Sequence, residues 1–171
     1  MPLQALVADL GVGLISGYVG TKVMEPVGSK LYELESEADR QQEDQVRPGP
    51  PYQIAAQKTA ALLGLTLSEQ QFEKAGLLFH YGLGMSWGPV YLLVRRMTHL
   101  HPLAAGLATG ASMSLLVDEG LTPALGFSAP NSAYPPSTHV RGFVAHLAFG
   151  LGVAATAEAL AWLGSESSRR R

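Results

Sequence analysis

The sequence predicts an all-α fold: an integral membrane bundle of four helices, with one long extramembrane loop that carries a short amphipathic helix. The chain has 171 residues, of which 47% are hydrophobic and only 15% charged, and its mean hydropathy is positive. It holds four apolar segments of about 20 residues or more, the length that crosses the hydrocarbon core of a bilayer. Three of these segments also carry pairs of glycines at helical spacing. We expect a single membrane domain over residues 1–171.

The four predicted spans are the most apolar stretches of the chain. They cover residues 3–24, 75–94, 102–127 and 142–163. The alternative is a soluble bundle of four buried helices. The glycine pairs are Gly13 and Gly17, Gly84 and Gly88, and Gly106 and Gly110. Small faces of this kind are common between membrane helices, whereas a glycine within a soluble helix costs about 1 kcal/mol relative to alanine. We therefore favour the membrane bundle, with the lipid bilayer as its first partner.

Residues 25–74 form the long polar loop between the first two spans. Its middle, ESEADRQQEDQVRPGPPY, is charged and rich in proline, which predicts an exposed loop. Residues 52–63 predict a short amphipathic helix, which lies either on the membrane surface or against the rest of the loop. Ser68 and Gln71 match a capping box, so the second long helix is expected to begin near residue 68.

Basic residues predict the orientation of the bundle. An even number of spans places both termini on one side of the membrane. Arg95 and Arg96 lie in the short connection after the second span, and residues 169–171 are all arginine. Since short segments rich in lysine and arginine stay in the cytoplasm, we expect cytoplasmic termini and a loop 25–74 in the periplasm or outside the cell.

Titratable side chains from all four spans converge on the half of the bilayer nearest the long loop. The candidates for a site are His80, Asp118, Glu119 and His146, with Lys22 and Glu25 in supporting positions. Charged groups in hydrocarbon are costly unless they are paired or hydrated, so such a cluster predicts a functional site. The alternative is a structural network of ion pairs and hydrogen bonds that fixes the register of the helices.

Two chemistries fit this cluster. Neighbouring residues of a helix point about 100° apart, so one of Asp118 and Glu119 faces the bundle interior and the other a neighbouring helix or loop. Pro123 cannot donate to the carbonyl of Glu119, which leaves a backbone acceptor beside the carboxylates. Carboxylate, carbonyl and imidazole groups ligate divalent cations, and the same groups form proton relays inside membranes. The sequence leaves both open.

Two further acids, Asp9 and Glu158, fall in the opposite half of the bilayer. They either complete a second layer of a proton path or reach the headgroups at the helix ends. His80 and His146 on parallel spans would also suit a haem held between two histidines, but a lone pair of histidines is weak evidence for haem.

Composition and motifs exclude several classes of protein. The net charge is −2 and no basic recognition motif occurs, which argues against nucleic-acid binding. The chain has no cysteine, so thiolate metal sites and cysteine nucleophiles are excluded. Residues 84–88 match the G-x-S-x-G nucleophile elbow, but that motif requires a strand-to-helix turn and here lies within a predicted span. With no phosphate loop or cofactor fingerprint, the sequence does not favour an enzyme.

Four stretches of the sequence resemble those of a known family. They are RPGPPYQIAAQKTAALLG, FHYGLGMSWGPVY, DEGLTPALGF and, at residues 19–25, VGTKVME. The chain resembles the YagU-like group of small bacterial inner-membrane proteins over roughly residues 10 to 160. The resemblance implies a multi-span inner-membrane protein. It brings no catalytic residues, since no biochemical activity is assigned to that family.

The sequence therefore supports two functions. The first is a small inner-membrane protein whose half-buried histidine and carboxylate cluster handles protons or a cation. The second is an accessory or scaffold protein in which the cluster is structural and the acidic loop binds a partner. The glycine faces are also compatible with a homo-oligomer or with a membrane partner protein.

Overall fold

The computed structural model describes residues 3–169, and no strand occurs among them. The elements are α1 (Leu3–Leu34), α2 (Glu37–Val46), α3 (Pro51–Leu62), α4 (Glu69–Thr98), α5 (Pro102–Met113), the π-helix η1 (Ser114–Leu121), α6 (Thr122–Ala124), the 3-10 helix η2 (Asn131–Ala133) and α7 (Pro136–Arg169). The predicted all-α fold is confirmed.

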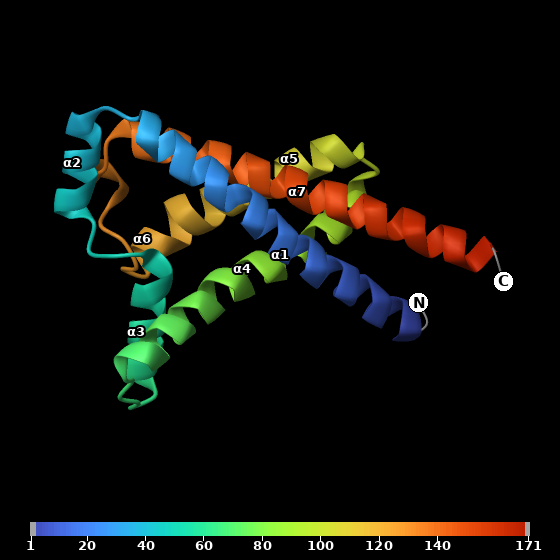
Figure 1. Ribbon diagram of the computed structural model, residues 1–171, viewed down its shortest axis with the longest axis horizontal. Coiled ribbons are helices and arrows are strands. Elements are labelled where there is room, and N and C mark those ends of the chain that lie inside the picture. Colours follow the sequence, from blue (N-terminus) through green and yellow to red (C-terminus); the bar gives the residue numbers. More distant parts are fainter. Residues whose placement is uncertain (1–2, 170–171) are drawn as a thin grey trace.

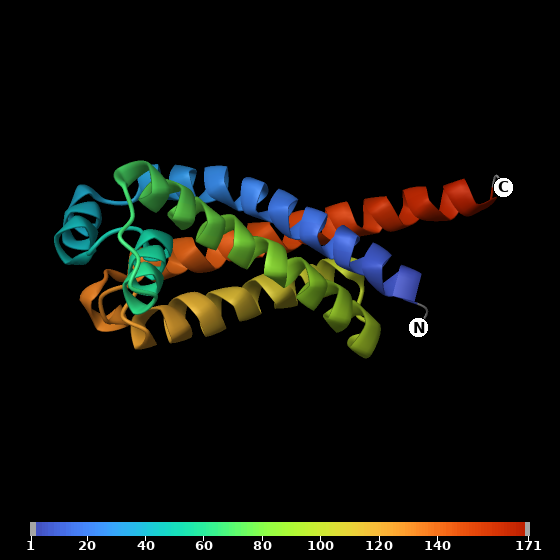
Figure 2. The ribbon, with the colours of Figure 1, turned by 90° about the horizontal axis from the view of Figure 1, so that it is seen from below.

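Four long helical stretches run alternately along the molecule: α1, α4, the continuous run α5–η1–α6, and α7 (Figures 1 and 2). Three of the predicted spans each lie within one of them, and the remaining span, 102–127, extends three residues beyond the end of α6. The N- and C-terminal ends of the described chain lie at one end of the molecule, and α2, α3 and α6 lie at the other (Figure 1). We call these the terminal end and the loop end.

Two of the four stretches are long and apolar enough to cross a membrane within the described residues. They are α4 and residues Pro136–Ser165 of α7. The other two predicted spans do not reach the same criterion, and the third is divided into α5, η1 and α6.

The long helices approach one another through glycine. A Cβ added at Gly88 would overlap the backbone of Gly13, and one added at Gly17 would overlap that of Gly84, so α1 and α4 cross with almost nothing between their backbones. In the same way, Gly106 of α5 and Gly150 of α7 meet backbone to backbone. The predicted close-packing faces are confirmed.

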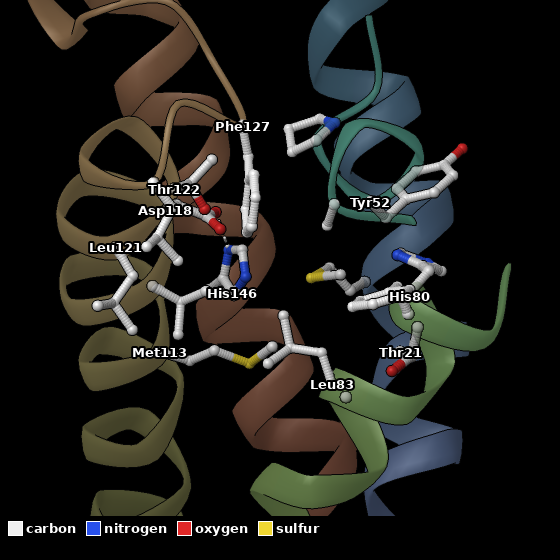
Figure 3. Close-up of a pocket in the computed structure, with 17 residues that line it drawn as sticks. Thr21, Tyr52, His80, Leu83, Met113, Asp118, Leu121, Thr122, Phe127 and His146 are labelled. Carbon is white, nitrogen blue, oxygen red and sulfur yellow. Dashed lines mark ion pairs between the residues drawn. The ribbon is translucent and has the colours of Figure 1, made fainter. Parts of the chain in front are cut away.

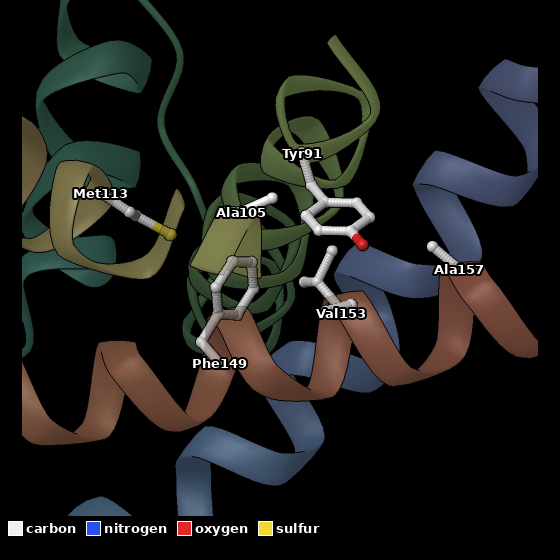
Figure 4. Packing of buried hydrophobic residues seen from close by; sticks show 7 residues of the cluster. Tyr91, Ala105, Met113, Phe149, Val153 and Ala157 are labelled. Carbon is white, nitrogen blue, oxygen red and sulfur yellow. The ribbon is translucent and has the colours of Figure 1, made fainter. Parts of the chain in front are cut away.

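The buried apolar core is small and lies at the level of the glycine crossings, where Phe149 and Val153 pack against Gly20. Tyr91, Phe149 and Val153 are fully buried there beside Ala105 (Figure 4). Small residues dominate the remaining core, because backbones at glycine crossings leave little room for side chains.

The acidic stretch is largely exposed, as predicted, but it is not an irregular loop. Its residues 37–46 form α2, whose N-cap is Ser36. Glu37 and Asp39 lie in the first turn, where their negative charges interact favourably with the positive end of the helix dipole. Glu43 of α2 is buried, with only 2% of its surface exposed. The first long helix also continues past the predicted span, to Leu34.

Predictions for the rest of the loop are confirmed. The short helix expected over residues 52–63 is α3, and it packs against α4. Ser68 and Gln71 form the predicted capping box, and α4 begins at the next residue after Ser68.

Candidate functional site

A cavity of about 380 Å³ opens among the long helices at their loop-end halves (Figure 3). Side chains from α1, α3, α4, η1 and α7 line it, and most of them are apolar. Among the described residues, no lysine or arginine lines this cavity. Its titratable lining groups are Tyr52, His80, Asp118 and His146.

Two histidine–carboxylate pairs flank the cavity. On one side, Nε2 of His80 in α4 lies 3.3 Å from Oε1 of Glu25 in α1. On the other, Nδ1 of His146 in α7 lies 3.3 Å from Oδ2 of Asp118 in η1. Figure 3 shows His80 and His146 on opposite walls. The convergence expected at the loop end therefore takes the form of two separate pairs.

Glu119 turns away from the apolar cavity. Its Oε1 lies 2.8 Å from Nδ1 of His139, and Nε2 of His139 lies 3.1 Å from the carbonyl oxygen of Asn131. Both partners of His139 are oxygen atoms that accept hydrogen bonds, so either ring nitrogen has an acceptor when it carries a hydrogen. Asp118 and Glu119 thus point in different directions, as expected for neighbouring residues of a helix.

A second cavity, of about 210 Å³ and lined mainly by polar and charged residues, lies at the loop end around Glu119 and His139. Asp118 and Thr122 line both this polar cavity and the apolar one. Asp118 thus stands in the wall between a polar chamber and an apolar chamber.

The carbonyl of Glu119 has a partner from outside the helix. Nδ2 of Asn131 donates a hydrogen bond of 2.8 Å to it. The acceptor that Pro123 leaves free is therefore used to tie the connection after α6 back to η1. The chain just before Pro123 is a π-helix, a form that occurs often at functional sites.

The four candidate residues do not gather into one metal centre. Among the described residues, no group of three or more histidine, aspartate and glutamate side chains is placed to hold a metal ion. The four residues are divided among three separate pairs: His80 with Glu25, Asp118 with His146, and Glu119 with His139. The rotation of each helix about its axis separates side chains that share the same depth.

The supporting residues also have partners. Lys22 donates to Glu25 at 3.0 Å and to the hydroxyl of Tyr81, and that hydroxyl donates to Glu25 at 2.8 Å. Glu25 is therefore neutralised by a lysine and hydrogen-bonded by a phenol, in addition to its pairing with His80.

At the terminal end, both predicted acids pair with arginines of α4. Asp9 forms an ion pair with Arg96. Glu158 accepts from Nε of Arg95 and from the hydroxyl of Tyr91, each at 2.9 Å. These contacts tie α1 and α7 to α4.

A cluster around Arg141, the Arg141 cluster, was not among the predicted sites. Arg141 of α7 binds Glu35 at 2.6 Å and Glu43 at 2.5 Å, and Thr138 donates to Glu43 at 2.8 Å. The carboxylates are almost fully buried, and burial raises the pKa of Glu35. The sequence signal is a single arginine at the edge of an apolar segment, which needs acidic partners from elsewhere.

The sequence also contains a repeat that hydropathy does not reveal. GLISGYVGTKVME (13–25) and GLATGASMSLLVD (106–118) share the pattern G-x-x-x-G-x-x-x-[ST]-x-x-x-[DE]. HYGLGMSWG (80–88) and HLAFGLGVA (146–154) share H-x-x-x-G-x-x-x-[GA]. Both halves of the molecule, α1–α4 and α5–α7, therefore contain a glycine crossing and a histidine–carboxylate pair. The crossings differ in register by one helical turn, because Gly150 meets Gly106 where Gly88, and not its repeat partner Gly84, meets Gly13.

Comparison of the chain with family models, with curated proteins and with solved structures found no match. The resemblance to the YagU-like family stays a prediction, and the function is argued from the site itself.

Proposed function

We propose that the protein is a four-span membrane protein that takes up and releases protons at the Asp118–His146 pair. Support for the membrane comes from large apolar side chains that point outward on all four long stretches. Examples are Leu14, Leu78, Leu116 and Val140. Such an extensive apolar surface is costly in water and suits a hydrocarbon environment. Location in a bacterial inner membrane with cytoplasmic termini belongs to the same proposal.

The observation that carries the proton function is the position of Asp118 between the two cavities. A proton that arrives through the polar cavity reaches this carboxylate without crossing hydrocarbon. The Glu119–His139 pair stands in the same polar cavity and provides a further group that accepts and passes on protons.

The geometry of His146 suits this role. Its Nδ1 lies 2.8 Å from the carbonyl oxygen of Gly142, so Nδ1 carries a hydrogen and donates it. Nε2 is then the nitrogen that gains or loses a proton. Once Nε2 is protonated, the imidazolium charge is balanced by the neighbouring Asp118 carboxylate.

Titration of the site tests the proposal directly. Infrared difference spectra of the purified protein between acidic and alkaline pH should contain carboxyl and imidazole bands that disappear in Asp118→Asn. The matched control is Glu25→Gln, the equivalent position in the other half, where Lys22 already neutralises the carboxylate. If Asp118→Asn leaves the spectra unchanged, the proton site is not Asp118 and the proposal fails.

A second candidate function is that of an accessory or scaffold protein. The observation that favours it is that each predicted polar residue already has a protein partner, as in the Glu119–His139 and Asp9–Arg96 pairs. Under this alternative, Asp118→Asn chiefly lowers the melting temperature, and the infrared spectra show no titration that depends on Asp118.

A further inference from the structure

We propose that the apolar cavity binds a small apolar organic cation, with Asp118 as its counter-charge. The inference deepens the proton function and rests on it, since it names the substrate of the same site. Size, lining, charge and access each bear on this proposal.

The size and lining of the cavity suit a compact organic molecule. Its volume of about 380 Å³ falls within the range of small-ligand pockets, which is roughly 300–1,000 Å³. Three aromatic rings, those of Tyr52, Phe79 and Phe127, line it together with the thioethers of Met24 and Met113. Figure 3 shows Phe127 and Tyr52 around the same space. Aromatic faces attract a quaternary ammonium group as well as apolar carbon.

The charge of the lining selects a cation. Asp118 is the lining carboxylate, and no described lysine or arginine lines the cavity to neutralise it. The hydrogen on Nδ1 of His146 is already donated to Gly142, so a neutral His146 leaves the negative charge of Asp118 in place. An anion would meet this carboxylate in an apolar chamber, which is strongly unfavourable.

Access to the cavity is from the side. Leu83 of α4, Leu121 of η1 and Leu125, which follows α6, line the cavity and are also exposed on the outer surface. The contact between α4 and α5 is much smaller than the equivalent contact between α1 and α7. The opening therefore faces the hydrocarbon of the proposed membrane, where an apolar cation accumulates near the interface.

Cation and proton then compete for Asp118. The titratable and charged groups that line the two cavities with this carboxylate, or adjoin it in the chain, are Tyr52, His80, His146, Glu43, Arg47, Glu119, Tyr134, His139 and Arg141. Arg141 is held by Glu35 and Glu43, and Arg47 by Glu43. Binding of a cation should therefore release the proton from the Asp118–His146 pair, and acidification should weaken binding.

The test is calorimetric binding of benzyltrimethylammonium to the purified full chain in detergent. The matched ligand is neopentylbenzene, which has the same shape without the charge. We expect the cation to bind with release of a proton at mildly acidic pH. Asp118→Asn should lower its affinity by about tenfold or more while leaving the weak affinity for neopentylbenzene unchanged. Equal affinity for the cation in wild type and Asp118→Asn overturns the inference.

Two tryptophan variants locate the binding site. Val117 lines the cavity, whereas its neighbour Leu116 is exposed on the outer surface. Val117→Trp should abolish binding of benzyltrimethylammonium, and Leu116→Trp should preserve it, with both variants first shown to melt like the wild type. Loss of binding in both, or in neither, places the ligand elsewhere. The infrared titration does not depend on any ligand, so failure of the proton function and failure of the cation site are distinguishable.

Discussion

The two halves of the molecule carry the same sequence pattern and differ in what surrounds their carboxylates. In the first half, Glu25 is bound by Lys22 and by the hydroxyl of Tyr81 as well as by His80. In the second half, Asp118 pairs with His146 beside a cavity that no described lysine or arginine lines. Glu25 thus has a lysine as its counter-charge, whereas Asp118 has a histidine, and this difference is why the proposed proton exchange is assigned to Asp118.

The helices that carry these carboxylates also differ in form. The backbone of α1 is α-helical through Glu25 and Pro26, whereas Asp118 lies in the π-helix η1. A π-helix widens the turn and rotates the residues after it relative to those before it. In the second half, where this rotation occurs, Asp118 lines both cavities and Glu119 points toward His139.

The largest expected effect comes from separating the halves at the Arg141 cluster. Arg141→Met should destabilise the protein by about 3–5 kcal/mol, because it leaves the buried carboxylate of Glu35 without its counter-charge and leaves Glu43 with Arg47 alone. Thermal unfolding in detergent measures the change. The control is Lys30→Met, which removes an exposed ion pair with Glu33 and should change stability by less than about 1 kcal/mol. Similar effects of the two variants would show that the cluster does not hold the halves together.

A smaller effect tests whether the two glycine crossings are equivalent. Gly88→Ala and Gly150→Ala each place a Cβ against the backbone of the opposing helix, and each should cost about 1–3 kcal/mol. Gly82→Ala and Gly142→Ala lie in the same two helices with open space beside them, so they should be neutral or slightly stabilising. Melting temperatures of the four variants give the comparison. Tolerance of Gly150→Ala alone would mean that the second crossing is looser than the first.

The smallest expected effect concerns equivalent hydroxyls one turn before the carboxylates. Thr21 donates to the carbonyl of Gly17 at 3.0 Å, whereas the buried hydroxyl oxygen of Ser114 has no hydrogen-bond partner in the described structure. Ser114→Ala should therefore be neutral or stabilising by up to about 1 kcal/mol, and Thr21→Val should be destabilising by a similar amount. Chemical unfolding curves of the two variants resolve the difference, and a loss of stability in Ser114→Ala would mean that its hydroxyl has a partner.

The positions of the long helices can be predicted from sequence because hydropathy, glycine spacing and the Ser68 capping box are local signals. The helix α2 also has local signals, the N-cap Ser36 and the acids of its first turn. What local signals do not show is the burial of Glu43, whose partner Arg141 is distant in the chain. The local charge content of a segment does not show which of its carboxylates will pair with a distant arginine and become buried.

The candidate site is predictable in part. Depth along a helix follows from residue number, so the gathering of His80, His146 and Asp118 at one level can be expected. Which side chain faces which partner depends on the rotation of each helix. That rotation is set by the glycine crossings and by the π-helix, neither of which hydropathy measures. His139 lies just outside the last predicted span and for this reason is missed as the partner of Glu119.

The Arg141 cluster also orders events during biosynthesis. Glu35 and Glu43 are translated early, but their common partner lies in α7, the last helix of the described chain. While the ribosome is still making the segments in between, both carboxylates remain hydrated and α2 has nothing to dock on. The Arg141 cluster can therefore form at the loop end only after α7 has been synthesised. A nascent chain released before Arg141 would carry an open acidic segment, which a protease could distinguish from the finished protein.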